Sequence, residues 1–99
     1  MTDLEKIHKI AERVRKEVVG DYSSEGLCKE CSKQICEELK AAGIEGATML
    51  HGTVGYHPHW WVRLGNTLID VTGDQFDGNN IPPILVVPWD GWDGLYVED

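Results

Sequence analysis

Three side chains of this 99-residue chain could together carry out nucleophilic chemistry: Cys28, His59 and Asp70. A cysteine thiolate can attack a carbonyl carbon, and an imidazole can take up and return the proton. A carboxylate beside the imidazole can hold it in one tautomer. These roles require the three side chains to meet in space, so the next question is which elements of secondary structure carry them.

Two amphipathic helices are predicted in the first half of the chain. In the first, apolar residues recur at steps of three and four, and Thr2 and Glu5 form the pattern of a capping box. The second helix is predicted over residues 27–42 and stops at Gly43. Its apolar stripe consists of Leu27, Cys31, Ile35, Leu39 and Ala42.

The three cysteines occupy different positions on this second helix. Cys28 falls in the first turn, about 40° from the centre of the apolar stripe at 100° per residue. Unpaired N–H groups and the helix dipole favour a thiolate there. Cys31 lies within the stripe and is interpreted as a small buried apolar residue, whereas Cys36 points away from the stripe.

After Gly46 the pattern changes to short strands. Runs rich in β-branched and aromatic residues cover 47–54, 59–64, 67–71 and 84–87, with turn residues between them. Helices followed by antiparallel strands predict an α+β fold, and the length predicts a single domain over 1–99. The aromatic and acidic stretch 89–94 is compatible with a folded-back loop, a rim for ligands or a simple terminus.

The turn at Gly65 and Asn66 sets the predicted relation between the histidine and the aspartate. If Leu64 pairs with Thr67 across this turn, His59 and the carboxylate at position 70 become diagonal neighbours on one face. A slip of one residue would place them on opposite faces.

Composition excludes several classes of function. A net charge of −8 argues against nucleic acid as a partner. No stretch is long and apolar enough to span a membrane, and three cysteines without an export signal predict reduced thiols in the cytoplasm. Residues 41–99 hold a single basic residue, Arg63, against eight acidic ones, which indicates either a solvated surface or a preference for a cationic substrate. The sequence does not predict the oligomeric state.

The residues around the three candidates form a familiar order. Gly26-Leu27-Cys28 opens a helix that has a small residue four places later, Ser32, and that ends at Gly43-Ile44. His59-Trp60-Trp61-Val62 and then Ile69-Asp70 follow on successive strands. Over roughly residues 24–76 this set resembles the transglutaminase-like branch of the papain-like cysteine enzymes.

The resemblance implies a fold and an activity. The fold would be a papain-like core with an N-terminal helix and a central nucleophile helix on a small antiparallel sheet. The activity would be that of a cysteine peptidase, transglutaminase-like hydrolase or acyltransferase. Such an enzyme passes through an acyl-thioester on a peptide, a protein or a small amide or acyl substrate. In this scheme Cys28 is the nucleophile, His59 the general base and then acid, and Asp70 the orienting group.

The resemblance also suggests residues that would surround the substrate. Trp60 stands where relatives carry a smaller residue and would reshape the cleft. The other expected substrate-binding residues are Trp61, Tyr22 and Gln75. The oxyanion donor besides the Cys28 N–H stays open among Tyr22, Ser23 and Ser24. No cofactor or catalytic metal is implied, and replacement of an orienting Asp70 is expected to spare the fold.

Two other functions remain open at this point. A structural zinc ion could be bound by Cys28, Cys31, His57 and His59. Against this, Cys31 lies in the apolar stripe and is expected in the core. The chain could also be an inactive, binding-only relative of the same fold. A thioredoxin-like use of the Cys28–Cys31 pair is disfavoured, because such motifs follow a strand and this one follows a helix and a loop.

Overall fold

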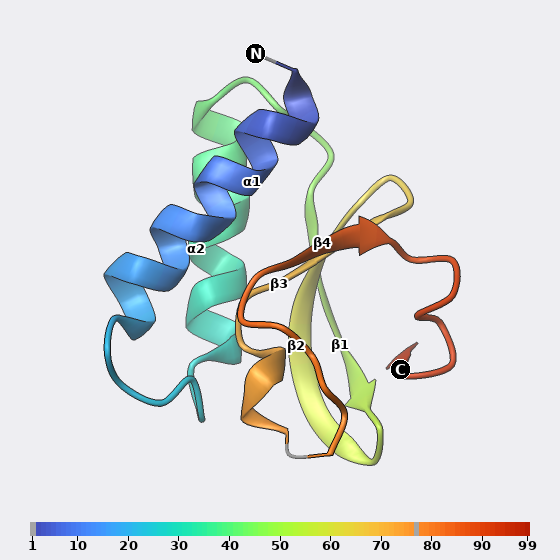
Figure 1. Ribbon diagram of the computed structural model, residues 1–99. Helices are drawn as coiled ribbons and strands as arrows, with labels where there is room; N and C mark the ends of the chain where they lie inside the picture. The colour runs from blue at the N-terminus through green and yellow to red at the C-terminus, as the bar shows by residue number, and fades with distance from the viewer. Residues whose placement is uncertain (1, 77) are drawn as a thin grey trace.

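The computed structural model describes residues 2–76 and 78–99, and it has an α+β fold (Figure 1). Two α-helices come first and five strands follow, which confirms the predicted fold class. The helices are α1 (Asp3–Val14), continued by a π-helical turn η1 (Arg15–Val19), and α2 (Cys28–Ala41). The strands are β1 (Thr48–Val54), β2 (His57–Leu64), β3 (Thr67–Asp70), β4 (Leu85–Pro88) and β5 (Tyr96–Glu98), with a short 3-10 turn η2 (Gly73–Gln75) after β3.

The helix boundaries follow local signals in the sequence. The predicted capping box is present, since the Glu5 N–H donates to the Thr2 hydroxyl and the Thr2 N–H donates to the Glu5 carboxylate. Helix α2 begins at Cys28, one residue later than predicted. It ends before Gly43, which adopts the left-handed conformation with φ 81°. Neither helix, nor any other among the described residues, has the length and apolarity that crossing a membrane requires.

The strands form one antiparallel sheet in the order β4-β3-β2-β1-β5. Leu64 pairs with Thr67, as the hairpin prediction requires. Strand β5 was not predicted; it pairs with the end of β1, so that Tyr96 lies opposite Val54. The stretch 89–94 therefore folds back through a series of turns and returns the chain to the sheet.

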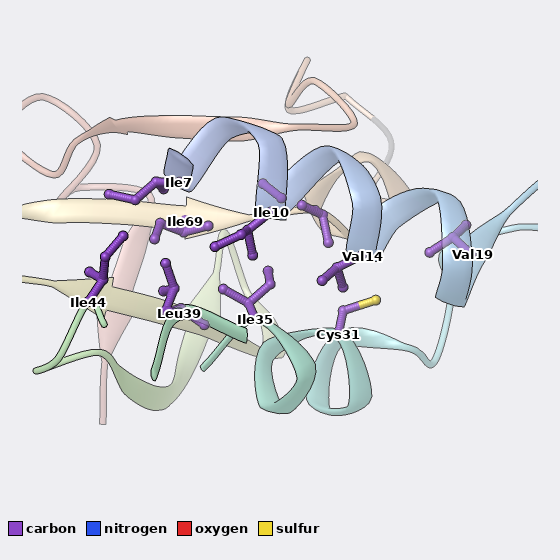
Figure 2. Packing of buried hydrophobic residues seen from close by; sticks show 12 residues of the cluster. Ile7, Ile10, Val14, Val19, Cys31, Ile35, Leu39, Ile44 and Ile69 are labelled. Atoms are coloured by element: carbon purple, nitrogen blue, oxygen red, sulfur yellow. The ribbon is translucent and has the colours of Figure 1, made fainter. Parts of the chain in front are cut away.

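The two faces of the sheet are covered differently. One face packs against α1 and α2 and forms the helix-side cluster, in which Val62 and Ile69 from the sheet meet apolar side chains of both helices (Figure 2). The opposite face is covered by the segment that follows β3 and forms the tail-side cluster. The buried members of the tail-side cluster are Val54, Trp61, Leu68, Ile81, Leu85 and Tyr96.

Three element ends meet at one end of the molecule. Helix α2 packs along β2, and both elements run from the lower end of Figure 1 toward its top. The turn η2 lies at this lower end as well, directly below the end of β3. The start of the predicted nucleophile helix and the start of the histidine strand are thus on the same side of the domain.

Candidate active site

His59 and Asp70 form a buried hydrogen-bonded pair. The Nε2 atom of His59 lies 2.8 Å from Oδ2 of Asp70, and the two residues are 1% and 2% exposed. They meet because the register of β2 and β3 places them diagonally on one face of the hairpin. The sequence-based prediction of this contact is confirmed.

The Asp70 carboxylate accepts three further hydrogen bonds. Oδ1 accepts from the N–H of Thr72 at 2.9 Å and from its hydroxyl at 3.1 Å. Oδ2 accepts from the hydroxyl of Tyr96 at 2.6 Å. A buried carboxylate needs such partners, and each donor in turn depends on the carboxylate. The expectation that Asp70 can be replaced without cost to the fold must therefore be revised.

The other ring nitrogen of His59 is left without a partner. Among the described residues, Nδ1 of His59 is buried and accepts or donates no hydrogen bond. In a neutral ring one nitrogen carries the proton and the other accepts. Because Nε2 faces the Asp70 carboxylate, we assign the proton to Nε2, which leaves Nδ1 with a free lone pair.

Cys28 occupies the first position of α2 and is partly exposed. The next residue, Lys29, places its ammonium 5.4 Å from the ring centroid of Trp60, which is the next residue after His59. This cation–π contact ties the first turn of α2 to the beginning of β2.

The thiol and the imidazole nevertheless approach the sheet from different sides. Along β2, Trp60 and Val62 face the helices, whereas His59 and Trp61 face the tail-side cluster. Within the part of the chain that the structure describes, no hydrogen bond joins Cys28 to His59. A contact between them has to form around the end of the sheet where α2 and β2 begin.

The pKa values of the other two thiols are raised. Burial, followed by the negative charge of Asp70, raises the pKa of the Cys31 thiol to about 12. Burial and the neighbouring Glu37 also raise the pKa of Cys36.

An ion-pair network that the sequence analysis missed anchors the loop before Cys28. The Arg15 guanidinium donates to both carboxylate oxygens of Asp74, at 2.7 and 2.9 Å, and to the carbonyl of Val71 at 2.8 Å. The hydroxyl of Ser24 donates to the same carboxylate at 2.7 Å. Burial acts to raise the pKa of Asp74, but the hydrogen bonds from Arg15 and Ser24 outweigh it and lower that pKa. The start of η1, the loop before α2 and the turn η2 are thereby joined.

The expected substrate-binding residues lie in different environments. Trp60 is half-buried, and Tyr22 is 84% exposed on the loop before α2. Gln75 is half-buried and donates to the carbonyl of Thr72 at 2.9 Å. Trp61 is fully buried, so its side chain supports His59 from within the core and is not available to a ligand.

The surroundings of His59 are closed. The ring of Phe76 packs edge-on against His59 at 4.8 Å and stacks on His57 at 5.0 Å. Ser24 is already committed to Asp74, which leaves Tyr22 and Ser23 as the freer oxyanion candidates. A surface hollow of about 450 Å³ lies near the far end of α2, lined partly by Cys36 and Ile44, and is not connected with these residues.

The residues of the zinc alternative do not gather into a site. Among the described residues, no group of three or more cysteine, histidine, aspartate or glutamate side chains is placed to hold a metal ion. Cys31 lies in the helix-side cluster, and His59 already uses Nε2 on Asp70. Of the four ligands in the zinc alternative, only Cys28 and His57 are then left.

Fold and site together define an α+β domain with a buried histidine–aspartate pair and a cysteine at a helix start. Comparison with models of known families, with curated proteins and with solved structures finds no match to this chain.

Proposed function

We propose that the chain is a thiol-dependent hydrolase or acyltransferase that acts on an amide, peptide or related acyl bond. In this proposal Cys28 is the nucleophile, His59 the general base and then acid, and Asp70 the orienting group, within a papain-like, transglutaminase-like core. The observation that carries it is the state of His59. One ring nitrogen is fixed by a buried carboxylate, and the other has no hydrogen-bond partner among residues 2–76 and 78–99.

The chemistry follows from that state. Nδ1 of His59 takes the proton of the Cys28 thiol, and the thiolate attacks the acyl carbon of the substrate. As the tetrahedral adduct collapses, the imidazolium returns the proton to the leaving amine, and an acyl-thioester remains on Cys28. Water or an amine then gives a proton to Nδ1, attacks the thioester and regenerates the thiol. Asp70 stays ionised throughout and stabilises the imidazolium.

Two local movements are required. Catalytic hydrogen bonds are often open before substrate binds, so the absence of a Cys28–His59 bond in the free protein does not exclude the pair. Rotation of the Cys28 side chain at the start of α2 is the movement that closes it. Phe76 packs edge-on against His59, and in this proposal its ring moves aside to admit the thiol.

The proposal extends to substrate and compartment. The excess of acidic residues after position 40 favours a cationic or amine-bearing substrate. Exposed Tyr22 and half-buried Trp60 and Gln75 are the residues proposed to contact it. The three cysteines are free thiols, and a thiol nucleophile suits the reducing cytoplasm.

A binding-only domain is the second candidate function. It is favoured by the complete burial of the His59 ring and by its lack of a bond to Cys28. In that case the histidine–aspartate pair would be a structural device that fixes the register of the hairpin.

Limited alkylation separates the two functions. A substoichiometric amount of iodoacetamide at pH 7, followed by peptide mapping, should modify Cys28 before Cys31 or Cys36. His59→Gln should slow this modification at least tenfold, whereas the matched variant His57→Gln, two residues away on the same strand, should not. Preferential labelling of another cysteine, or equal rates in the two histidine variants, would support the binding-only domain.

A further inference from the structure

The last strand carries a tyrosine hydroxyl into the histidine–aspartate pair. Tyr96 is fully buried, and its hydroxyl donates to Oδ2 of Asp70 at 2.6 Å. This is the same oxygen that faces Nε2 of His59 at 2.8 Å. The hydroxyl therefore acts on the acceptor that holds the imidazole.

The backbone and ring of Tyr96 are fixed independently of this bond. Its N–H donates to the carbonyl of Trp92 at 2.9 Å, and its own carbonyl accepts from the indole of Trp89 at 3.2 Å. Its ring packs edge-on against Trp61 with centroids 5.3 Å apart. The folded-back tail thus delivers the hydroxyl to a defined position.

Gly73 packs directly over the contact between Tyr96 and Asp70. A Cβ atom at position 73 would lie 2.6 Å from the Tyr96 hydroxyl and 2.8 Å from Oδ2 of Asp70. Only glycine leaves room for this close packing. The glycine backbone therefore packs closely against both the hydroxyl and the carboxylate.

We infer that Tyr96 is a positioning residue: acting through Asp70, it holds His59 in the Nε2–H tautomer and keeps Nδ1 free, so the C-terminal tail is part of the active site. This inference deepens the proposed function and rests on it for its catalytic meaning. With the hydroxyl present, both carboxylate oxygens are held, Oδ2 by Tyr96 and Oδ1 by Thr72.

Loss of the hydroxyl would loosen this arrangement. Oδ2 would then be held by the imidazole alone while Oδ1 keeps its two bonds from Thr72, so the carboxylate would be less tightly fixed about its Cβ–Cγ bond. Burial, and then the charge of Asp70, raise the pKa of Tyr96, which keeps its proton available for donation. Donation to a charged acceptor is among the stronger hydrogen bonds in a protein.

The test compares wild type with Tyr96→Phe, which keeps the ring and removes only the hydroxyl. Nitrogen-15 NMR of the His59 ring at neutral pH reports the tautomer. We expect the Nε2–H form in wild type and a mixture with the Nδ1–H form in the variant. The rate constant for alkylation of Cys28 by iodoacetamide should fall roughly tenfold, as expected for loss of one hydrogen bond to a charged group.

A destabilised control separates positioning from packing. Leu68→Ala removes a buried side chain of the same tail-side cluster that makes no hydrogen bond in this network. It should lower the melting temperature yet leave the tautomer of His59 unchanged. Should Tyr96→Phe fail to fold, Gly73→Ala provides a second test, because its Cβ meets Ile81 as well as the Tyr96–Asp70 contact while every donor and acceptor stays in place.

The inference is overturned if Tyr96→Phe keeps a pure Nε2–H tautomer and the wild-type alkylation rate, or if Leu68→Ala shifts the tautomer equally. The ring-nitrogen measurement needs no reactive cysteine. An unreactive Cys28 in wild type would therefore contradict the proposed function, while the tautomer in Tyr96→Phe would still decide whether Tyr96 controls His59.

Discussion

The two faces of the sheet are built from different kinds of side chain. The helix-side cluster is apolar throughout, with Leu39, Val14 and Ala11 fully buried among residues of both helices and the sheet. The tail-side cluster is equally buried, but the hydroxyl of its member Tyr96 is linked to three further polar residues, namely His59, Asp70 and Thr72. The helix-side face stabilises the fold through burial of apolar area. The tail-side face adds a specific arrangement of hydrogen-bond donors and acceptors.

This difference indicates where stability and function lie. Burial of apolar surface is non-directional, so the helix-side cluster tolerates changes of shape better than changes of polarity. The polar network is directional, and each of its members depends on the others. Substitutions on the two faces should therefore differ in which property they change, stability or reactivity, as well as in the size of the effect.

The largest expected effect is that of Asp70→Ala. This variant leaves His59, Thr72 and Tyr96 with unpaired donors in the interior, and loss of one partner from a buried charged network costs about 3–5 kcal/mol. Urea denaturation should show this loss of unfolding free energy. The control Asp93→Ala, at an exposed position on the tail, should change it by less than ~0.5 kcal/mol. A folded Asp70→Ala protein as stable as the control would show that the network contributes little.

A smaller loss is expected on the apolar face. Leu39→Ala removes a fully buried side chain from the helix-side cluster and should cost about 3 kcal/mol. The exposed neighbour Lys40→Ala is the matched control. The contrast with the polar face appears in reactivity, because Leu39→Ala should leave the alkylation rate of Cys28 unchanged in the folded protein. A large change in that rate would mean that the two faces are coupled.

The helix-side cluster should also make the protein sensitive to alkali. The pKa of Cys31 is raised from 9.0 to about 12, so the unfolded chain loses this proton before the folded chain does. Stability from this group is complete below pH 9 and is lost as the pH rises toward 12. Between pH 9 and 10 the loss should be about 1 kcal/mol.

The variant Cys31→Ala isolates this contribution. Its unfolding free energy should be lower at every pH because of the lost packing, but its decline between pH 9 and 10 should be shallower by that amount. Parallel pH profiles for the variant and wild type would contradict the buried, protonated state of Cys31.

The sequence predicted much of this molecule because its signals are local or periodic. The apolar stripes define both helices, and the turn at Gly65 and Asn66 sets the register that brings His59 to Asp70. Strand β5 gave no such signal, since its three residues are too short for alternation to be recognised. The hydroxyl of Tyr96 was missed for the same reason.

Two other features could not be predicted from the sequence, because they depend on contacts between distant parts of the chain. The Arg15–Asp74 ion pair joins residues 59 positions apart, and no local pattern predicts a contact at that separation. The burial of Trp61 depends on the tail that covers the second face, so this tryptophan was expected near the substrate but lies in the core. The distance between Cys28 and His59 likewise depends on how a helix end meets a curled sheet.

That last distance tests the central claim most directly. In a crystal structure of the protein at neutral pH, we expect Cys28 Sγ to reach Nδ1 of His59 within about 4 Å in at least one rotamer, with Nε2 still bonded to Asp70. The account is contradicted if the Phe76 ring or the backbone of β2 separates the two atoms in every rotamer of Cys28. The histidine–aspartate pair would then be a structural element of the tail-side face, and Cys28 an ordinary thiol at a helix start.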